Sequence, residues 1–371
     1  MLRHHRPVRT ATAALTAAVL AFAAAACGSS GGSPAAASAT AISSQRCAQN
    51  KAAGQITYLS GYEFQSSASI LEYVAADKLG YFKDLCLDVH LQPSTGDTAQ
   101  GTKLLAGGKA QIGAVAEQDL IQARANGIAI EGVSSYSDAG LDILMTNPDI
   151  TSLTQLDGKI IGDKGYMPAS VRAMLVKAGV NWNSLKVVTE GYDPTVLPRH
   201  QGGLEALTGF VSNEPNQLAD AGHKVTVWQP VKYGVPSSLG AMAVNPAFAA
   251  AHPTAVQDML RAALHAYAYC SASPARAAQC VGYAAALSGP TYDTKLNEQI
   301  WSTETRTVAD NPTPGQPLGG IDPKNVTALG DMLREFSIIP ASVASAQISS
   351  WFDDSYIKAD YNGNTLIWPA P

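Results

Sequence analysis

The order of apolar patterns along the chain limits its fold more than any other feature. From about residue 54, short apolar runs that predict strands alternate with segments whose apolar residues recur at helical spacing. Alternating strands and helices form a largely parallel sheet with helices on both faces. The alternation lapses after residue 133 and restarts at residue 159, so the sequence predicts an α/β protein with two such open sheets.

The boundaries of the expected elements follow from glycines, caps and changes of period. After residue 245 the pattern is almost entirely helical. No strict internal repeat accompanies the two α/β runs. The predicted strands are 56–59, 87–91, 112–115, 128–133, 159–162, 186–189, 206–211 and 225–228, and the predicted helices are 70–79, 98–106, 119–125, 170–177, 216–221, 247–271, 274–287, 293–309 and 323–336.

Composition excludes several classes of protein. The chain has 371 residues, of which 46% are hydrophobic and 15% are charged, values typical of a globular protein rather than a disordered one. The 20-residue apolar runs of a multi-span membrane protein are missing. A formal charge of −5, with both signs mixed along the chain, argues against a nucleic-acid partner.

The N-terminus has the pattern of an export signal. Basic residues between Arg3 and Arg9 precede an apolar stretch that ends in small residues at 24–26, followed by Cys27. This junction resembles a bacterial lipobox, in which the cysteine is diacylated; the alternative is an ordinary signal peptide. We expect a signal peptide over 1–26, lipidated Cys27 with a flexible tether over 27–50, and an extracytoplasmic protein anchored to the cell membrane by its lipid.

Cys27 also explains the odd number of cysteines. Four others remain, Cys47, Cys86, Cys270 and Cys280, and they allow three pairings. Cys270 and Cys280 flank a Ser-Ala-Ser-Pro bend between two predicted helices, so we favour 270–280 and 47–86 in an oxidising compartment. No Cys-x-x-Cys pair or neighbouring histidine indicates a metal site, and no cofactor is expected.

Five segments, in order, resemble signatures of the solute-binding proteins for nitrate, sulfonate and thiamine-pyrimidine transport. They carry a Gly-Tyr-Phe-Lys motif with a following Leu-Asp-Val, a Leu-Leu-Ala-Gly-Gly motif, a Leu-Asp-Gly-Lys motif, a Phe-Val-Ser-Asn-Glu-Pro motif, and Tyr-Gly-Val-Pro. The last is similar to the thiamine-precursor branch of the family. The segments are 79–89, 104–113, 153–162, 203–215 and 233–245, and the resemblance extends over residues 55 to about 370.

The resemblance implies a bilobal periplasmic-binding-protein fold of type II. Two open, mostly parallel sheets with helices on both faces would be joined by a two-strand hinge. Lobe one would contain 51–145 and 246–371, and lobe two 146–245, with crossings near 143–148 and 240–246. Closure would trap a small-molecule ligand, and the closed monomer would deliver it to an ABC permease and its ATPase.

The loops that follow the strands indicate the kind of ligand, since such loops face the cleft. They contain carboxylates and aromatic rings but no Lys or Arg; Lys164 and Lys232 only flank them. Anion sites offer helix N-termini and cationic donors instead. The loops therefore favour a flat, donor-rich heterocycle such as the aminopyrimidine precursor of thiamine. The alternatives are a sulfonate- or nitrate-type anion, or a sensor or envelope-assembly role without transport.

Carboxylates would pair with the amino and ring nitrogens of such a ligand, and aromatic rings would stack on its face. Glu214 and Tyr62 are the strongest candidates, and Ser170 could equally be a helix cap. The candidate ligand-binding residues are Tyr62, Glu63, Phe64, Glu117, Gln118, Tyr136, Tyr166, Ser170, Tyr192, Asn213, Glu214 and Tyr233.

Enzymatic motifs are not found in the sequence. Residues 96–103 imitate a phosphate-binding loop but have Thr102 where the lysine is required. Gly-x-Ser-x-Gly and His-Glu-x-x-His motifs are missing, and the histidines beyond the signal are scattered singly. We therefore expect a binding protein without catalytic residues.

Overall fold

The computed structural model describes residues 41–371. The predicted signal peptide, Cys27 and most of the predicted tether thus lie outside the described residues. Within 41–371, no helix is long and apolar enough to cross a membrane.

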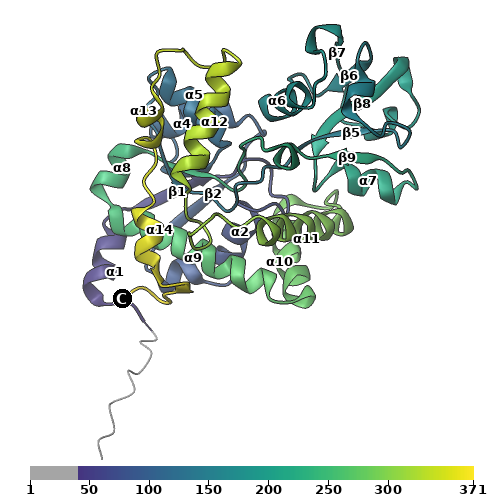
Figure 1. The fold of residues 1–371 in the computed structure, drawn as a ribbon. Helices are drawn as coiled ribbons and strands as arrows, with labels where there is room; N and C mark the ends of the chain where they lie inside the picture. The colour runs from purple at the N-terminus through teal and green to yellow at the C-terminus, as the bar shows by residue number, and fades with distance from the viewer. Residues whose placement is uncertain (1–40) are drawn as a thin grey trace, which may run out of the picture. The chain divides into compact units, whose positions relative to one another are not determined.

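The first sheet combines four strands from the first part of the described chain with β10, which follows the strands of the second sheet. Its order is β2-β1-β3-β10-β4. β10 runs antiparallel to both of its neighbours, whereas β1 is parallel to β2 and β3. We call this sheet and the helices around it lobe one (Figure 1). The strands are β1 (Gln55–Leu59), β2 (Asp88–Gln92), β3 (Ile112–Ala114), β4 (Glu131–Ser134) and β10 (Met242–Val244).

The second sheet repeats this design. Its order is β7-β6-β8-β5-β9, and only β5 runs antiparallel to its neighbours. We call it, with its helices, lobe two. Because the odd strand takes the same place in both sheets, the structure contains an internal repeat that the sequence does not show. The strands are β5 (Asp142–Thr146), β6 (Ile160–Asp163), β7 (Lys186–Thr189), β8 (Leu204–Phe210) and β9 (Thr226–Trp228).

Two segments, 135–141 and 229–241, connect the sheets. They pair with each other at Ser137 and Leu239, where the N–H of Leu239 donates to the carbonyl of Ser137 over 3.0 Å. The first crossing thus precedes the predicted range of 143–148. Residues 143–145 are fully buried and already belong to β5, which pairs with β8 and β9. The second crossing overlaps the start of the predicted 240–246.

Each predicted helix is found, one of them broken in two, and α1, α3, α13 and α14 were not predicted. The predicted helix 247–271 is two helices, because Pro253 has no N–H to continue the ladder of the preceding helix. The helices are α1 (Ser44–Lys51), α2 (Leu71–Lys78), α3 (Tyr81–Asp84), α4 (Thr98–Ala106), α5 (Glu117–Ala125), α6 (Ala169–Lys177), α7 (Glu214–Asp220), α8 (Pro246–Ala251), α9 (Pro253–Ser271), α10 (Pro274–Ser288), α11 (Thr294–Asp310), α12 (Pro323–Glu335), α13 (Ser345–Ser349) and α14 (Ser355–Asp360), and a hairpin of β11 (Tyr361–Asn362) and β12 (Thr365–Leu366) follows.

The N-terminal helix is fixed to lobe one. The range predicted as tether, 27–50, ends in helix α1, which Ser43 caps through its hydroxyl. Arg46 pairs with the buried Asp258 of α9 over 2.8 Å, so a helix is stable where composition indicated a flexible segment. The structure pairs Cys47 with Cys86 and Cys270 with Cys280, as the sequence favoured.

Candidate functional site

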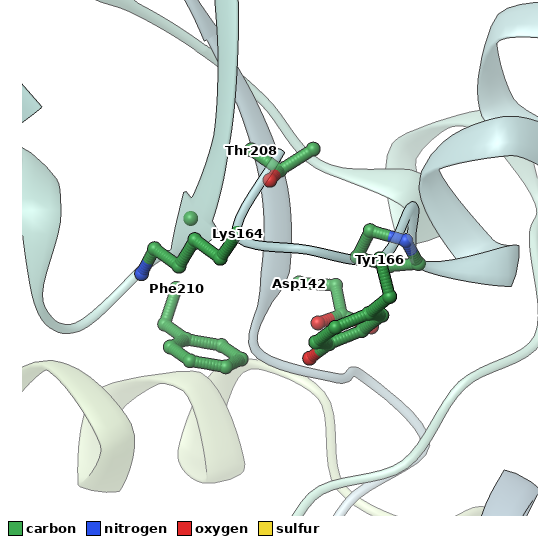
Figure 2. A pocket seen from close by; sticks show the side chains of 7 residues that line it. Asp142, Lys164, Tyr166, Thr208 and Phe210 are labelled. Carbon is green, nitrogen blue, oxygen red and sulfur yellow. The ribbon is translucent and has the colours of Figure 1, made fainter. Parts of the chain in front are cut away.

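Loops that follow the strands carry two polar clusters. We call the first the Lys164 pocket, which is a small cavity in lobe two. Its walls come from the start of β5, the end of β8 and the loop between β6 and α6, as Figure 2 shows. The lining residues are Asp142, Lys164, Tyr166, Pro168, Thr208, Gly209 and Phe210.

Lys164 was not expected in the site. Its side chain is 10% exposed and forms an ion pair with Glu214, and its Nζ lies 5.0 Å from the centre of the Phe210 ring. Burial lowers the pKa of Lys164 to about 8, and the Asp142 carboxylate opposes that shift. The expectation that the site holds no cation is therefore wrong. The sequence showed Lys164 only as a flanking residue, because its partner lies fifty positions further on.

Glu214 is already engaged by the protein itself. One carboxylate oxygen pairs with Lys164, and the other accepts the backbone N–H of Phe210 over 2.6 Å. Asn213, the N-cap residue of α7, donates from its side chain to the same carboxylate over 3.4 Å. These bonds hold the turn that leads from β8 into α7. In this structure Glu214 thus positions Lys164 and Phe210.

Asp142 presents a less occupied carboxylate to the pocket. The hydroxyl of Ser170, at the start of α6, donates to one of its oxygens over 3.0 Å. Burial raises the pKa of Asp142 to about 6, Ser170 and Lys164 act in the opposite direction, and Asp119 adds to the increase. In Figure 2 the Asp142 carboxylate lies beside the ring of Tyr166, while the ammonium group of Lys164 points away from it.

Three of the predicted tyrosines are unusually exposed for their size. Tyr62 of lobe one is 44% exposed, and Tyr166 and Tyr192 of lobe two are 55% and 79% exposed. Partial burial raises the pKa of Tyr62, and the charge of Glu63 adds to this. Both lobes thus carry exposed aromatic faces, and those of Tyr166 and Tyr192 lie at the Lys164 pocket.

The second cluster, which we call the Glu304 cluster, comprises Ser67, Ala68, Ser212 and Glu304. The Glu304 carboxylate accepts the hydroxyl of Ser67 over 2.7 Å, the N–H of Ala68 over 2.7 Å and the hydroxyl of Ser212 over 2.8 Å. Burial raises the pKa of Glu304 to about 7, although these donors lower it in part. Ser212 belongs to lobe two and the other three residues to lobe one, so this carboxylate joins the lobes.

Neighbouring acceptors occupy further N–H groups of the loop between β1 and α2. Glu72 accepts the N–H of Ser69 over 2.6 Å and the hydroxyl of Tyr136 over 2.7 Å. Asn297 accepts the N–H of Ser66 over 2.7 Å. Burial raises the pKa of Glu72 to about 7 against the effect of these donors. The loop's N–H groups at Ser66, Ala68 and Ser69 are therefore bonded within the protein.

The other predicted site residues are dispersed. Tyr136 lies in the core of lobe one, and Phe64 packs against the same core. Tyr233 packs against the neighbouring core cluster through a turn that contacts α6, and Glu63 is exposed. Glu117 and Gln118 begin α5. Burial raises the pKa of Glu117 to about 7, although the hydroxyls of Ser135 and Ser238, in the two crossing segments, lower it in part. The predicted residues that gather at the Lys164 pocket are Tyr166, Ser170, Tyr192, Asn213 and Glu214.

Sequence reasoning missed Glu72, Asp142, Lys164 and Glu304. One signal could have identified Glu304: it lies on the apolar face of α11, four residues after Ile300 and four before Val308. A carboxylate on such a face needs buried donors. Among residues 41–371, no group of three His, Cys, Asp or Glu side chains is placed to hold a metal ion.

Comparisons with known proteins agree on the family and the fold. Residues 67–277 match the family described as NMT1/THI5 like. A formylaminopyrimidine-binding protein of Halalkalibacterium halodurans is 27% identical over 172 residues, which are 44% of this chain and 50% of that protein. The chain thus aligns with about half the length of this curated relative.

Two solved structures share the fold. The periplasmic aliphatic sulphonate binding protein of Escherichia coli aligns over 79% of this chain and 91% of its own, with a TM-score of 0.58 and 14% identity. The periplasmic nitrate-binding protein of Synechocystis PCC 6803 aligns over 82% and 87%, with a TM-score of 0.56 and 11% identity. The predicted periplasmic-binding-protein fold is confirmed.

Proposed function

Because the chain belongs to the NMT1/THI5-like family, we propose that it is the extracytoplasmic solute-binding lipoprotein of an ABC importer. It captures a small, donor-rich heteroaromatic compound of the aminopyrimidine class between its lobes. Lipidated Cys27 holds the monomer at the membrane, and hinge closure presents the loaded form to a permease and its ATPase.

The observation that carries this proposal is the Asp142 carboxylate beside the Tyr166 ring in the Lys164 pocket. With Ser170 as its donor, Asp142 has acceptor capacity left for an exocyclic amino group or a protonated ring nitrogen. Tyr166 and Phe210 line the same pocket and offer faces for a planar ring. The relative from Halalkalibacterium halodurans is named a formylaminopyrimidine-binding protein, which supports a ligand of the aminopyrimidine class.

The loop after β1 supports an uncharged or cationic ligand over an anion. Backbone N–H groups at the start of a helix are the usual donors to an oxyanion. Here Ala68 and Ser69 donate to Glu304 and Glu72, so an anion would have to displace buried carboxylates. A further negative charge beside these two carboxylates would also lose its hydration without gaining a cation.

Lys164 favours the second candidate function, the binding of a sulfonate or nitrate. It is the cation that lines the pocket, and an anion could pair with it if Glu214 released it. Glu214 is 2% exposed, so this release would leave an unpaired carboxylate in a buried place. We therefore rank the anion below the aminopyrimidine.

Calorimetric titration of the purified full-length protein tests the ligand class. The ligands are 4-amino-5-hydroxymethyl-2-methylpyrimidine, its formylamino analogue, taurine and nitrate. We expect binding of one or both pyrimidines and no heat change with the anions. Binding of taurine or nitrate alone would contradict the proposal.

Cell-based uptake tests the transport role separately. We expect uptake of the bound pyrimidine to fall in cells that lack this protein and to return with the wild-type gene. A Cys27→Ser variant is expected to appear in the medium or the soluble extract rather than in the membrane fraction. Uptake that survives the deletion unchanged would favour a sensor or envelope-assembly role.

A further inference from the structure

Helix α11 of lobe one lies against α7 of lobe two, as Figure 1 shows. Three polar contacts join α11 to α7 and to the turn that precedes α7, and we call these contacts the α11–α7 seam. Lys295 pairs with Asp220 over 2.8 Å, Gln299 donates to the same carboxylate over 3.3 Å, and Ser212 donates to Glu304 over 2.8 Å. No side chain that lines the Lys164 pocket takes part in these contacts.

The three contacts differ in their surroundings. The Lys295 side chain is 71% exposed, and an ion pair in water contributes little. Glu304 is 1% exposed and Ser212 is 2% exposed, so the hydrogen bond between them is made away from water. The bond between Ser212 and Glu304 is therefore the strongest of the seam.

Residues of its own lobe hold the Glu304 carboxylate in the orientation that this bond requires. Ser67 and Ala68, both in lobe one, donate to the carboxylate and fix its position. Opening of the lobes would separate only Ser212 from it. The acceptor thus keeps its orientation in the open form, and little side-chain entropy is lost when the bond forms again.

The seam and the pocket share one turn. Phe210 lines the pocket at the end of β8, and Ser212 follows two residues later. The N–H of Asn213 donates to the carbonyl of Phe210 over 3.0 Å, and the N–H of Phe210 donates to Glu214 over 2.6 Å. A shift of this turn on ligand binding would therefore move Ser212 relative to Glu304.

We propose that the α11–α7 seam is a latch, in which the Ser212–Glu304 bond stabilises the closed form. The bond does not contact the ligand, but it sets how long the ligand stays bound. This inference rests on one part of the proposed function, namely that closure of the lobes captures a ligand. A contact made in the closed form alone shifts the equilibrium toward closure whatever the ligand. The latch is thus expected to act equally on every ligand.

Hydrogen exchange of the full-length protein without ligand tests the latch directly. The Ser212→Ala variant is compared with Ser302→Ala, which removes an exposed hydroxyl from helix α11. We expect exchange to become several-fold faster in segments 64–78 and 204–222 of Ser212→Ala only, with an unchanged thermal unfolding midpoint. Exchange equal to that of the control would overturn the proposal.

Dissociation kinetics add a readout that local loosening would not produce. With 4-amino-5-hydroxymethyl-2-methylpyrimidine as the probe, we expect Ser212→Ala to raise the dissociation rate about tenfold while the association rate stays the same. Ser212→Thr, which keeps the hydroxyl, should restore the wild-type rate. A change in the ratio of affinities for two pyrimidines would show direct ligand contact and contradict the latch. If no pyrimidine binds the wild-type protein, the proposed function fails, and hydrogen exchange still decides on the latch.

Discussion

The Glu304 cluster and the Lys164 pocket use the same chemical group for opposite purposes. Glu304 in lobe one accepts three hydrogen bonds from the protein and is almost completely buried. Asp142 in lobe two accepts the Ser170 hydroxyl and lines a pocket with aromatic rings. The two carboxylates thus differ in the number of donors that the protein supplies: three for Glu304 and one for Asp142.

The two lobes share a strand order, so this contrast arises after the strands. In lobe one the loop that follows β1 leads into α2 and is bonded to α11. In lobe two the corresponding loop follows β6 and contains Lys164 and Tyr166. Helix α11 covers the first of these loops, because the chain returns to lobe one after β9.

Removal of the carboxylate from the Glu304 cluster should have the largest effect on stability. Glu304→Ala leaves the Ser67 hydroxyl and the Ala68 N–H buried without an acceptor, and it also opens a void. We expect the free energy of unfolding to fall by about 4 kcal/mol. Chemical denaturation measures it, and Glu298→Ala, at an exposed position of the same helix, is the control. If Glu304→Ala lowered the free energy of unfolding no more than the control does, the Glu304 carboxylate would not have the structural role that distinguishes it from Asp142.

The pH dependence of stability should reveal the buried carboxyl group of Glu72. Burial raises its pKa to about 7 in the folded protein, whereas the unfolded chain keeps the ordinary value near 4.5. The contribution of this group to stability is therefore complete below about pH 4.5 and is lost as the pH rises through about 7. Relative to Glu72→Gln, the wild type should lose about 3 kcal/mol over this interval. Parallel stability curves for the two proteins would show that the shift is absent.

Removal of an aromatic face from the Lys164 pocket should weaken binding moderately. Tyr166→Ala is expected to reduce pyrimidine affinity about tenfold, whereas Tyr166→Phe keeps the ring and should reduce it little. Calorimetry measures both variants. Equal losses in the two would assign the effect to the hydroxyl group and would contradict a stacking role.

Neutralisation of the ion pair should have the smallest effect on the proposed ligand. The double variant Lys164→Met with Glu214→Gln removes both charges, and Gln can still accept the N–H of Phe210. Pyrimidine affinity is expected to change by less than about threefold, because the proposal assigns the charged contact to Asp142. Loss of pyrimidine binding in the double variant would place the contact at Lys164 or Glu214 and would contradict the role proposed for Asp142.

Local signals in the sequence predicted most of the fold. Helix α4 has the predicted bounds, because Asp97 caps its start and Gly107 follows its end. The break at Pro253 was missed, although proline is compatible only with the first turn of a helix. The first crossing was predicted too far along the chain. Residues 143–145 are apolar, and an apolar run does not distinguish a hinge segment from a buried strand.

The site was less predictable, because its central bonds join distant parts of the chain. Ser67 and Glu304 are 237 residues apart, and Lys164 and Glu214 are 50 apart. Loop composition showed the acids and the aromatic rings near the cleft, but it did not show which acids have donors. Glu72 and Glu304 lie in helices, outside the loops that composition singled out.

The central claim is that Asp142 recognises a donor-rich heterocycle, and calorimetric titration of Asp142→Asn tests it most directly. The control variant is Asp149→Asn, which changes an exposed carboxylate in the same lobe. We expect Asp142→Asn to lower the affinity for 4-amino-5-hydroxymethyl-2-methylpyrimidine about a hundredfold, since a charged hydrogen bond is lost, and Asp149→Asn to leave it unchanged. Wild-type affinity in Asp142→Asn would contradict the account.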